Sequence, residues 1–186
     1  AADRRHAPGG ALVTTAPPTV GAGELRAALR GHASGVAVLT AATPDGPAGV
    51  TITSFTSVSA EPALVSFALA GTSSTWARIK GCRRFGIQLL GAGQREVAER
   101  FAARGVDRFA PPTRWHTGPH GVPLLDDCVA WLVGARHRQL TLGDHELIVC
   151  VVEHVRIGAP GGGLVHLHGG LHAAPGSPAV PGGRQG

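Results

Sequence analysis

Residues 128–158, CVAWLVGARHRQLTLGDHELIVCVVEHVRIG, have the pattern of two long strands that meet at a tight turn, Gly143 and Asp144. Apolar and β-branched residues dominate both halves, and glycine with aspartate suits a two-residue hairpin turn. Two long strands joined this tightly are antiparallel, because a parallel pair needs a long crossover connection between them. This segment therefore predicts an antiparallel hairpin and argues against a wholly parallel sheet.

Other strand patterns precede and follow this hairpin without the regular alternation of strand and helix that a parallel sheet requires. TPDGP has proline and glycine where a reverse turn needs them, so its flanking strands are expected to pair. A small antiparallel barrel of about six or seven strands is the natural closure, because closing the sheet removes exposed edges. Besides the two long strands, the expected strands are GVAVLTA (35–41), AGVTITS (48–54), PALVSFALA (62–70), RFGIQLL (84–90) and GLVHLHGGLHA (163–173).

Three short helices are expected among these strands. GELRAALRGHASG places Leu25, Ala28 and Leu29 on one helical face, as an amphipathic helix does. STWARIKG predicts one or two helical turns, and GAGQREVAERFAARG predicts a helix that stops near Gly105. Residues 106–126 then read as a long loop. The buried face of the third helix is expected to hold Val97, Ala98 and Phe101.

A chain of 186 residues suits one domain with a sizeable core. Residues 1–23 and 174–186 are rich in proline and glycine and lack apolar periodicity, so both are expected to be flexible tails. The folded domain is expected to span residues 24–173.

Charge and cysteine usage restrict the partners and the compartment. The formal charge is +5, but Lys80 is the only lysine and the arginines are spread along the chain. A nucleic-acid surface needs clustered basic residues, so we expect no nucleic-acid partner, although an anionic small molecule is compatible. Cysteines without a C-x-x-C pair favour a reducing cytoplasm. Without a membrane-length apolar run or a signal-peptide core, we expect a cytoplasmic protein that does not bind membranes.

Two clusters of hydroxyl side chains flank the strand PALVSFALA. Thr51, Thr53 and Ser54 end one expected strand, where hydroxyls and backbone donors can bond the edge of a flat heterocycle. The second cluster precedes the short helix and could bind an anion, although the spacing alone favours a plain helix N-cap. The second cluster consists of Ser73, Ser74 and Thr75.

Histidines form the remaining candidates. His145 follows the tight turn and could contact a ligand at the rim of a barrel, although such a histidine is also typical of a surface. His166 and His168 are expected on one face of a strand, but no third ligand occurs at a recognisable spacing, so we expect no metal site. No H-E-x-x-H, G-x-S-x-G, phosphate-loop or dinucleotide-binding signature occurs.

One strand is apolar on both faces. Val36 and Val38 share one face, and Ala37 and Leu39 share the other. Either helices or a second copy of the chain must cover the outer face, and we favour a homodimer.

Taken in order, the segments of this chain resemble the flavin reductase family of FMN-binding split-barrel proteins, the reductase partners of two-component flavin monooxygenases. The resemblance covers about residues 25–172. It rests on GVAVLTA, GVTITSFTSVSAEPALVSFAL, SSTW, RFGIQLL, QREVAERFA, DRFA, GVPLLDDCVAWL, GDHELIVCVVEHV and GGLH. It implies a mainly β (α+β) Greek-key split barrel, a homodimer with flavin near the subunit interface, FMN or FAD as the flavin, and NADH or NADPH as the electron donor.

The resemblance also assigns roles to residues. It places the region of Thr51, Ile52, Thr53 and Ser54 along the isoalloxazine ring and the region of Ser73, Ser74 and Thr75 at the flavin phosphate. His145 would lie on the nicotinamide side. The resemblance also makes Gln88 a cofactor-binding residue, connected with the phosphate contacts. Two departures bear on the pocket: Gln88 stands where the family often has asparagine, and VHLHGG replaces a stretch that often carries aromatic residues.

The activity that the resemblance implies is hydride transfer from nicotinamide to flavin, with the protein positioning the two rings. The leading hypothesis is an NAD(P)H:flavin oxidoreductase that releases reduced flavin to a partner monooxygenase. Two alternatives stay open. One is a flavin-retaining oxidase or monooxygenase, and the other is a flavin-binding module without enzymatic activity.

Overall fold

The computed structural model describes residues 20–158 and 161–175. Most of both predicted tails, residues 1–19 and 176–186, lies outside this range. In the described part, no helix is both long and apolar enough to cross a membrane.

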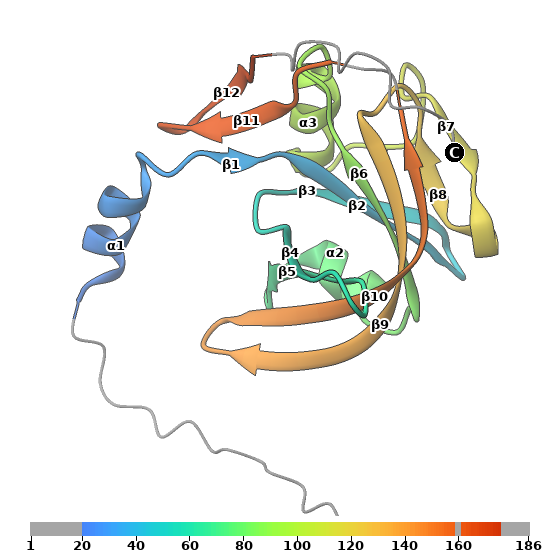
Figure 1. The fold of residues 1–186 in the computed structure, drawn as a ribbon, viewed down its shortest axis with the longest axis horizontal. Helices are drawn as coiled ribbons and strands as arrows, with labels where there is room; N and C mark the ends of the chain where they lie inside the picture. The colour runs from blue at the N-terminus through green and yellow to red at the C-terminus, as the bar shows by residue number, and fades with distance from the viewer. Residues whose placement is uncertain (1–19, 159–160, 176–186) are drawn as a thin grey trace, which may run out of the picture.

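The body is a seven-stranded antiparallel sheet with the strand order β3-β2-β6-β9-β10-β5-β4. The sheet curls around an apolar interior, and its end strands β3 and β4 follow one another in the chain (Figure 1). The predicted split barrel is therefore confirmed. In sheet order, the strands are Gly46–Ile52, Ala37–Thr43, Arg84–Leu89, Ala130–Leu142, His145–Ile157, Leu64–Ala70 and Thr56–Ser59.

The long hairpin expected from residues 128–158 forms as β9 and β10, each 13 residues long. Gly143 has a φ of 61° in the turn, a conformation that glycine adopts without a steric cost. The pairing contains two register shifts, the second between Val152 and His154. At such a bulge one strand carries an extra residue, which redirects the neighbouring side chains.

Two parts of the sequence prediction are wrong. Residues 163–173 form a hairpin, β11 (Leu164–Leu167) and β12 (Gly170–Ala173), because His168 and Gly169 take positive φ values and reverse the chain. With β1 (Ser34–Gly35) this hairpin makes a second sheet. The predicted loop 106–126 contains a short hairpin, β7 (Trp115–Thr117) and β8 (Pro123–Leu125), joined by the 3-10 turn Pro119–Gly121.

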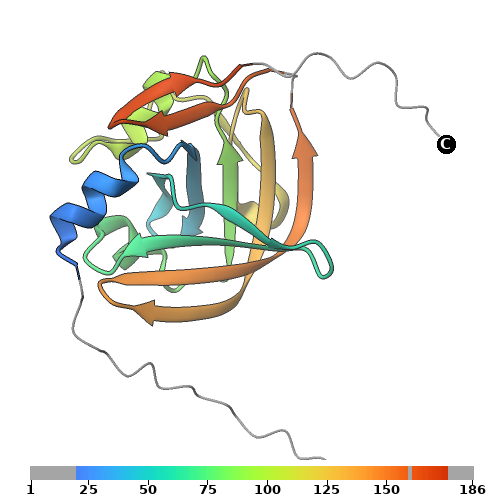
Figure 2. The same ribbon diagram turned by 60° about the vertical axis from the view of Figure 1, so that its left-hand side comes forward.

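The three predicted helices form, but they pack differently. Helix α1 (Ala22–Leu29) buries no residue, and Leu25 and Leu29 are 52% and 55% exposed. It projects from the body at the opposite side from the β4–β5 turn (Figure 2). Helix α2 (Ser74–Ile79) buries Trp76 and Ile79 against the barrel interior.

Helix α3 (Arg95–Ala102) packs on the outside of the barrel through Ala98 and Phe101, as predicted. Val97 is only half-buried. Gly49 of β3 permits the close approach, because a Cβ at this position would lie 2.8 Å from Cε1 of Phe101.

The strand that is apolar on both faces is covered by its own chain. Ala37 and Leu39 face the barrel interior. Val36 and Val38 join an outer cluster with Phe101 of α3 and with the segment around β8. Of the two covers considered for this strand, helices or a second copy, the chain's own segments provide the cover, so the predicted homodimer needs support from elsewhere.

Candidate functional site

A groove of about 1050 Å³ lies beside the barrel. It is bounded by the first half of β3, the end of β5, the start of α2 and the loop after α3. We call it the cationic groove, because its three arginines outnumber its two carboxylates, Asp45 and Asp107. Its hydroxyl and cationic side chains are Thr72, Ser73, Ser74, Thr75, Arg78, Arg104 and Arg108.

The cluster Ser73 to Thr75 reaches the groove, as the sequence predicted for a binding site. The N-cap interpretation is also correct, because Ser73 Oγ accepts a hydrogen bond of 3.2 Å from the backbone N–H of Trp76. Ser74 is exposed at the groove, whereas Thr75 is only 5% exposed. One cluster therefore both starts α2 and supplies hydroxyls to the groove.

Arg108 forms the fixed part of the groove. Its Nη1 donates to the carbonyl of Gly49 at 2.6 Å and to Oγ1 of Thr75 at 2.8 Å. Its Nε and Nη2 donate to the carbonyl of Ala103 at 3.2 and 2.6 Å. Burial lowers the pKa of this guanidinium, and the nearby positive charge of Arg78 lowers the pKa further. Arginine stays protonated nonetheless, so a positive charge is held in place.

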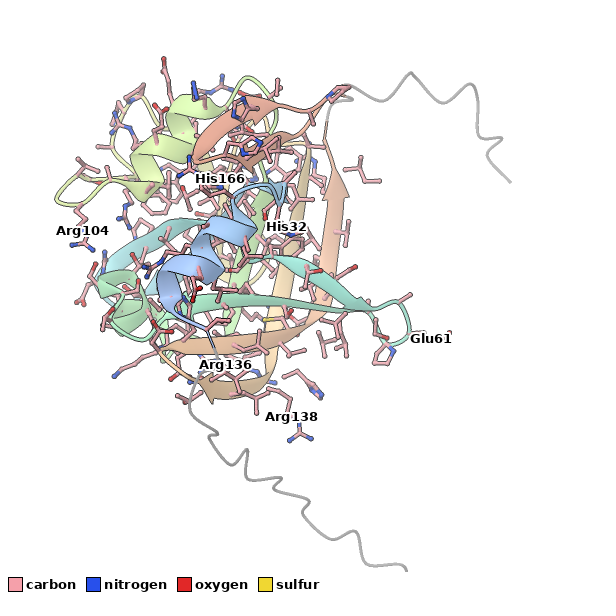
Figure 3. The ribbon with its side chains drawn as sticks, turned by 90° about the vertical axis from the view of Figure 1, so that its left-hand side faces the viewer. His32, Glu61, Arg104, Arg136, Arg138 and His166 are labelled. Atoms are coloured by element: carbon pink, nitrogen blue, oxygen red, sulfur yellow. The ribbon has the colours of Figure 1, made fainter. Side chains whose placement is uncertain are left out.

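Two further arginines are exposed at the groove. Arg78 makes a long contact of 3.5 Å with the carbonyl of Pro47. Arg104 extends from the loop after α3 (Figure 3). The sequence analysis missed all three arginines as site residues, because they come from separate segments whose proximity depends on the fold. The only signal was DRFA, which contains Arg108.

The predicted ring-binding residues do not line the groove. Thr51 Oγ1 donates a 2.6 Å hydrogen bond to the carbonyl of Ala98 in α3, and Ile52 is buried in the interior. Ser54 Oγ donates to the carbonyl of Ala68 at 2.7 Å and accepts from the N–H of the same residue at 3.0 Å. Thr53 is exposed.

Gln88 lies away from the groove. Its side chain is fully buried, and its Nε2 donates to Oγ1 of Thr40 at 3.2 Å. Thr40 in turn donates to the carbonyl of Pro123. Gln88 therefore belongs to an internal polar contact beneath β8 and is not placed to touch a groove ligand.

His145 is exposed at the tip of the β9–β10 hairpin. Its register partner on β5 is Ala70, which lines the groove. Its Nδ1 lies 2.7 Å from Oδ1 of Asp144, and this hydrogen bond lowers the pKa of the carboxyl group. The N–H of Gly71 donates to the carbonyl of Asp144 at 2.9 Å, so the hairpin tip is attached to the chain beside the groove.

His166 and His168 do not share a strand face. His166 is in β11, whereas His168 is in the turn with a φ of 52°. Over residues 20–158 and 161–175, no group of three or more ligand-type side chains is arranged to hold a metal ion.

The arginine and hydroxyl side chains of the groove suit an anionic ligand. Guanidinium groups and hydroxyls bind phosphate oxygens through charge-assisted hydrogen bonds. The groove then leads towards Val50 and Ala70, beyond which lie Thr53 and His145.

Comparisons with known proteins identify the family. Residues 29–175 match the family described as flavin reductase like domain. The chain is 42% identical over 134 residues to the NADH:FMN oxidoreductase of Rhodococcus erythropolis, covering 72% of this chain and 70% of that protein.

Solved structures show the same fold. The NADH:FAD oxidoreductase of Streptomyces globisporus, in complex with NAD and FAD fragments, is 31% identical with a TM-score of 0.75, covering 80% of this chain and 90% of that one. The styrene monooxygenase flavin reductase of Pseudomonas putida S12 is 29% identical with a TM-score of 0.74, covering 82% and 97%.

Proposed function

This chain belongs to the flavin reductase-like domain family, and we propose that it reduces a flavin whose phosphate is bound in the cationic groove. The enzyme is an NAD(P)H-dependent flavin oxidoreductase, and its relatives include reductase components of two-component monooxygenases. As a member of this family, the enzyme supplies its product, reduced flavin, to a separate monooxygenase.

The observation that carries the proposal is the convergence of the arginines and hydroxyls in one groove. Arg108 is held by Thr75 and the carbonyl of Gly49, so its charge is preorganised before a ligand arrives. Exposed Arg78 and Arg104 add charge at the same place. A phosphate monoester, as in FMN, or the first phosphate of FAD, matches these donors.

The isoalloxazine ring extends from the groove along the end of β3 in this proposal. Thr53 lies three residues beyond Val50, a reach of roughly 10 Å for an extended chain, so a ligand that extends from the groove past Val50 would approach Thr53 in this proposal. The hydrogen bonds between Ser54 and Ala68 shape the loop beside the ring. Gln88 is left out, because its side chain is buried elsewhere.

When bound, flavin would supply the hydride-accepting chemistry, so this chain would need no acid or base of its own for the transfer. The contribution of this chain is to place the two rings face to face and to supply positive charge and hydroxyl donors. His145 lies at the hairpin tip next to Ala70, and in this proposal it contacts the nicotinamide side.

FMN or FAD as the flavin, and NADH or NADPH as the donor, are the finer parts of this proposal. Steady-state oxidation of each reduced nicotinamide, with and without each added flavin, separates the four combinations. Oxidation that requires added flavin supports release of reduced flavin to a monooxygenase. A protein that stays yellow after dialysis and turns over without added flavin would favour the flavin-retaining alternative, and no oxidation in any combination would overturn the reductase proposal.

A homodimer is part of the proposal. Its support is the exposed apolar face of α1, where Leu25 and Leu29 are about half exposed, together with Leu140 and Leu142 near the tip of β9. Light scattering coupled to size-exclusion chromatography tests it, and a monomer at working concentrations would refute it. A cytoplasmic location is also proposed, and the three free cysteines of the described chain suit a reducing compartment.

A further inference from the structure

Two histidines from separate parts of the fold meet away from the cationic groove. His120 is in the 3-10 turn between β7 and β8, and His154 is in the second half of β10. Their Nε2 atoms are 3.3 Å apart. His120 Nε2 is also 3.6 Å from Oε2 of Glu153. We call these three residues the His120 cluster.

Two local irregularities bring the cluster together. His120 has a φ of 58° and a ψ of 22°, in the left-handed region that few residues other than glycine adopt. Glu153 is the extra residue at the register shift between Val152 and His154. Adjacent strand residues normally point to opposite faces, yet both Glu153 and His154 reach His120.

Arg84 completes the surroundings from β6. Its Nε donates to Oε2 of Glu153 at 2.7 Å, and its Nη2 donates to Oε1 at 3.2 Å. This two-point contact with Arg84 fixes the Glu153 carboxylate beside His120. The cluster therefore combines two imidazoles with a fixed negative charge, and His120 remains exposed to solvent.

We propose that His120 and His154 bind a divalent first-row transition-metal ion such as Zn²⁺ through their Nε2 atoms. Imidazole is a preferred ligand of these ions. Two nitrogens bound tetrahedrally at Zn–N distances of about 2.0–2.1 Å are separated by about 3.3 Å, which is the separation found here. Because no group of three ligand-type side chains is arranged for a metal among the described residues, water fills the other positions.

Glu153 supports this site without binding the ion directly. Its carboxylate offsets the charge of the ion and accepts a hydrogen bond from a metal-bound water, as second-shell carboxylates do. The ion joins β10 to the turn that leads into β8. Val122, just after that turn, is buried in the outer cluster. Metal binding therefore stabilises the position of the turn and of β8, which cover the outer face of the barrel.

The test uses the full chain without a histidine tag, freed of metal by chelation. Zn²⁺ is titrated by calorimetry, and Co²⁺ is added separately for its visible absorption on binding nitrogen ligands. The matched variants are His120→Asn, which tolerates the left-handed backbone, and His154→Gln, which keeps the strand. His137→Ala removes an exposed histidine of β9 outside the cluster.

The wild type and His137→Ala are expected to bind one Zn²⁺ per chain and to unfold at a higher temperature when Zn²⁺ is present. His120→Asn and His154→Gln are expected to lose both effects, while their metal-free unfolding temperatures show that they remain folded. Glu153→Gln is expected to weaken binding by about tenfold. The proposal is overturned if the wild type binds no ion, as for a simple hydrogen-bonded histidine pair, or if the two histidine variants bind as tightly as the wild type.

Discussion

Nη1 of Arg108 lies 2.8 Å from Oγ1 of Thr75, a side chain that is 5% exposed. The same nitrogen donates to the carbonyl of Gly49, so one guanidinium connects β3, α2 and the loop after α3. Positive charge is costly to bury, which is why burial lowers the pKa of Arg108. The backbone acceptors offset that cost and leave a rigid cationic wall in the groove.

Replacing Arg108 with lysine is expected to weaken both folding and flavin binding. A lysine ammonium cannot reproduce the planar fork that reaches Gly49, Thr75 and Ala103 together. Leaving buried acceptors without donors costs about 1–3 kcal/mol of unfolding free energy. Denaturant titration measures this loss, and the flavin KM should rise in the same variant. Unchanged stability would show that these hydrogen bonds contribute little.

Arg104→Gln separates ligand binding from stability. Arg104 is exposed and lines the groove, so its removal should raise the flavin KM by about tenfold, the effect of losing one charge-assisted hydrogen bond of about 1.5 kcal/mol. The unfolding temperature should not change. Arg83→Gln, which removes an exposed arginine outside the groove lining, is the control. Equal flavin KM values in the two variants would exclude Arg104 from the site.

His145→Ala is expected to raise the KM for the reduced nicotinamide or lower kcat, with little effect on folding. The side chain is exposed, and its recorded contact is with Asp144. Asp144→Asn is the matched control, because it keeps the imidazole and removes only the neighbouring charge. Steady-state kinetics with flavin held saturating measures the effect. If His145→Ala has wild-type kinetics, the histidine does not contact the nicotinamide.

The hairpin and the helices could be predicted because their signals are local. Gly143 with Asp144 defines the turn between β9 and β10, and the spacing of Ala98 and Phe101 identifies the packed face of α3. The reversal in residues 163–173 was missed because it depends on positive φ values at His168 and Gly169. A histidine in that conformation has no distinctive sequence signal.

The candidate site was only partly predictable. Ser73 to Thr75 could be identified because hydroxyls before a helix suit both a cap and an anion. Thr51 and Ser54 instead donate hydrogen bonds to the carbonyls of Ala98 and Ala68, respectively. The sequence could not predict that these two hydroxyls are used in internal hydrogen bonds, because the partners come from α3 and β5. The same long-range dependence hid the role of Arg108.

Gln88→Met tests whether the buried Gln88 side chain has a role in the protein interior or in flavin binding. Gln88 Oε1 is buried without a hydrogen-bond partner, whereas Nε2 donates to Thr40. Methionine has a similar volume and removes both polar atoms, and Thr40 keeps its hydrogen bond to Pro123. The unfolding free energy should stay within about 1.5 kcal/mol of the wild type, and the flavin KM should not change. A raised flavin KM at unchanged stability would return Gln88 to the phosphate site.

The three cysteines should differ in reactivity towards thiol reagents. Burial raises the pKa of Cys128 and of Cys150 from 9.0 to about 12. Cys82 is half-buried, and burial raises its pKa while the charge of Arg136 opposes this. At mildly alkaline pH the folded protein should therefore label only at Cys82, and Cys82→Ser should remove that labelling. In denaturant all three cysteines should label.

The same shifts affect the pH dependence of stability. The unfolded chain loses the thiol protons of Cys128 and Cys150 near pH 9.0, whereas the folded chain keeps them until about pH 12. Between these values the unfolded state binds fewer protons, so the free energy of unfolding should fall as the pH rises. Denaturant titrations across this interval measure the slope. A free energy of unfolding that stays constant across this interval would show that the two thiols have similar pKa values in the folded and unfolded states.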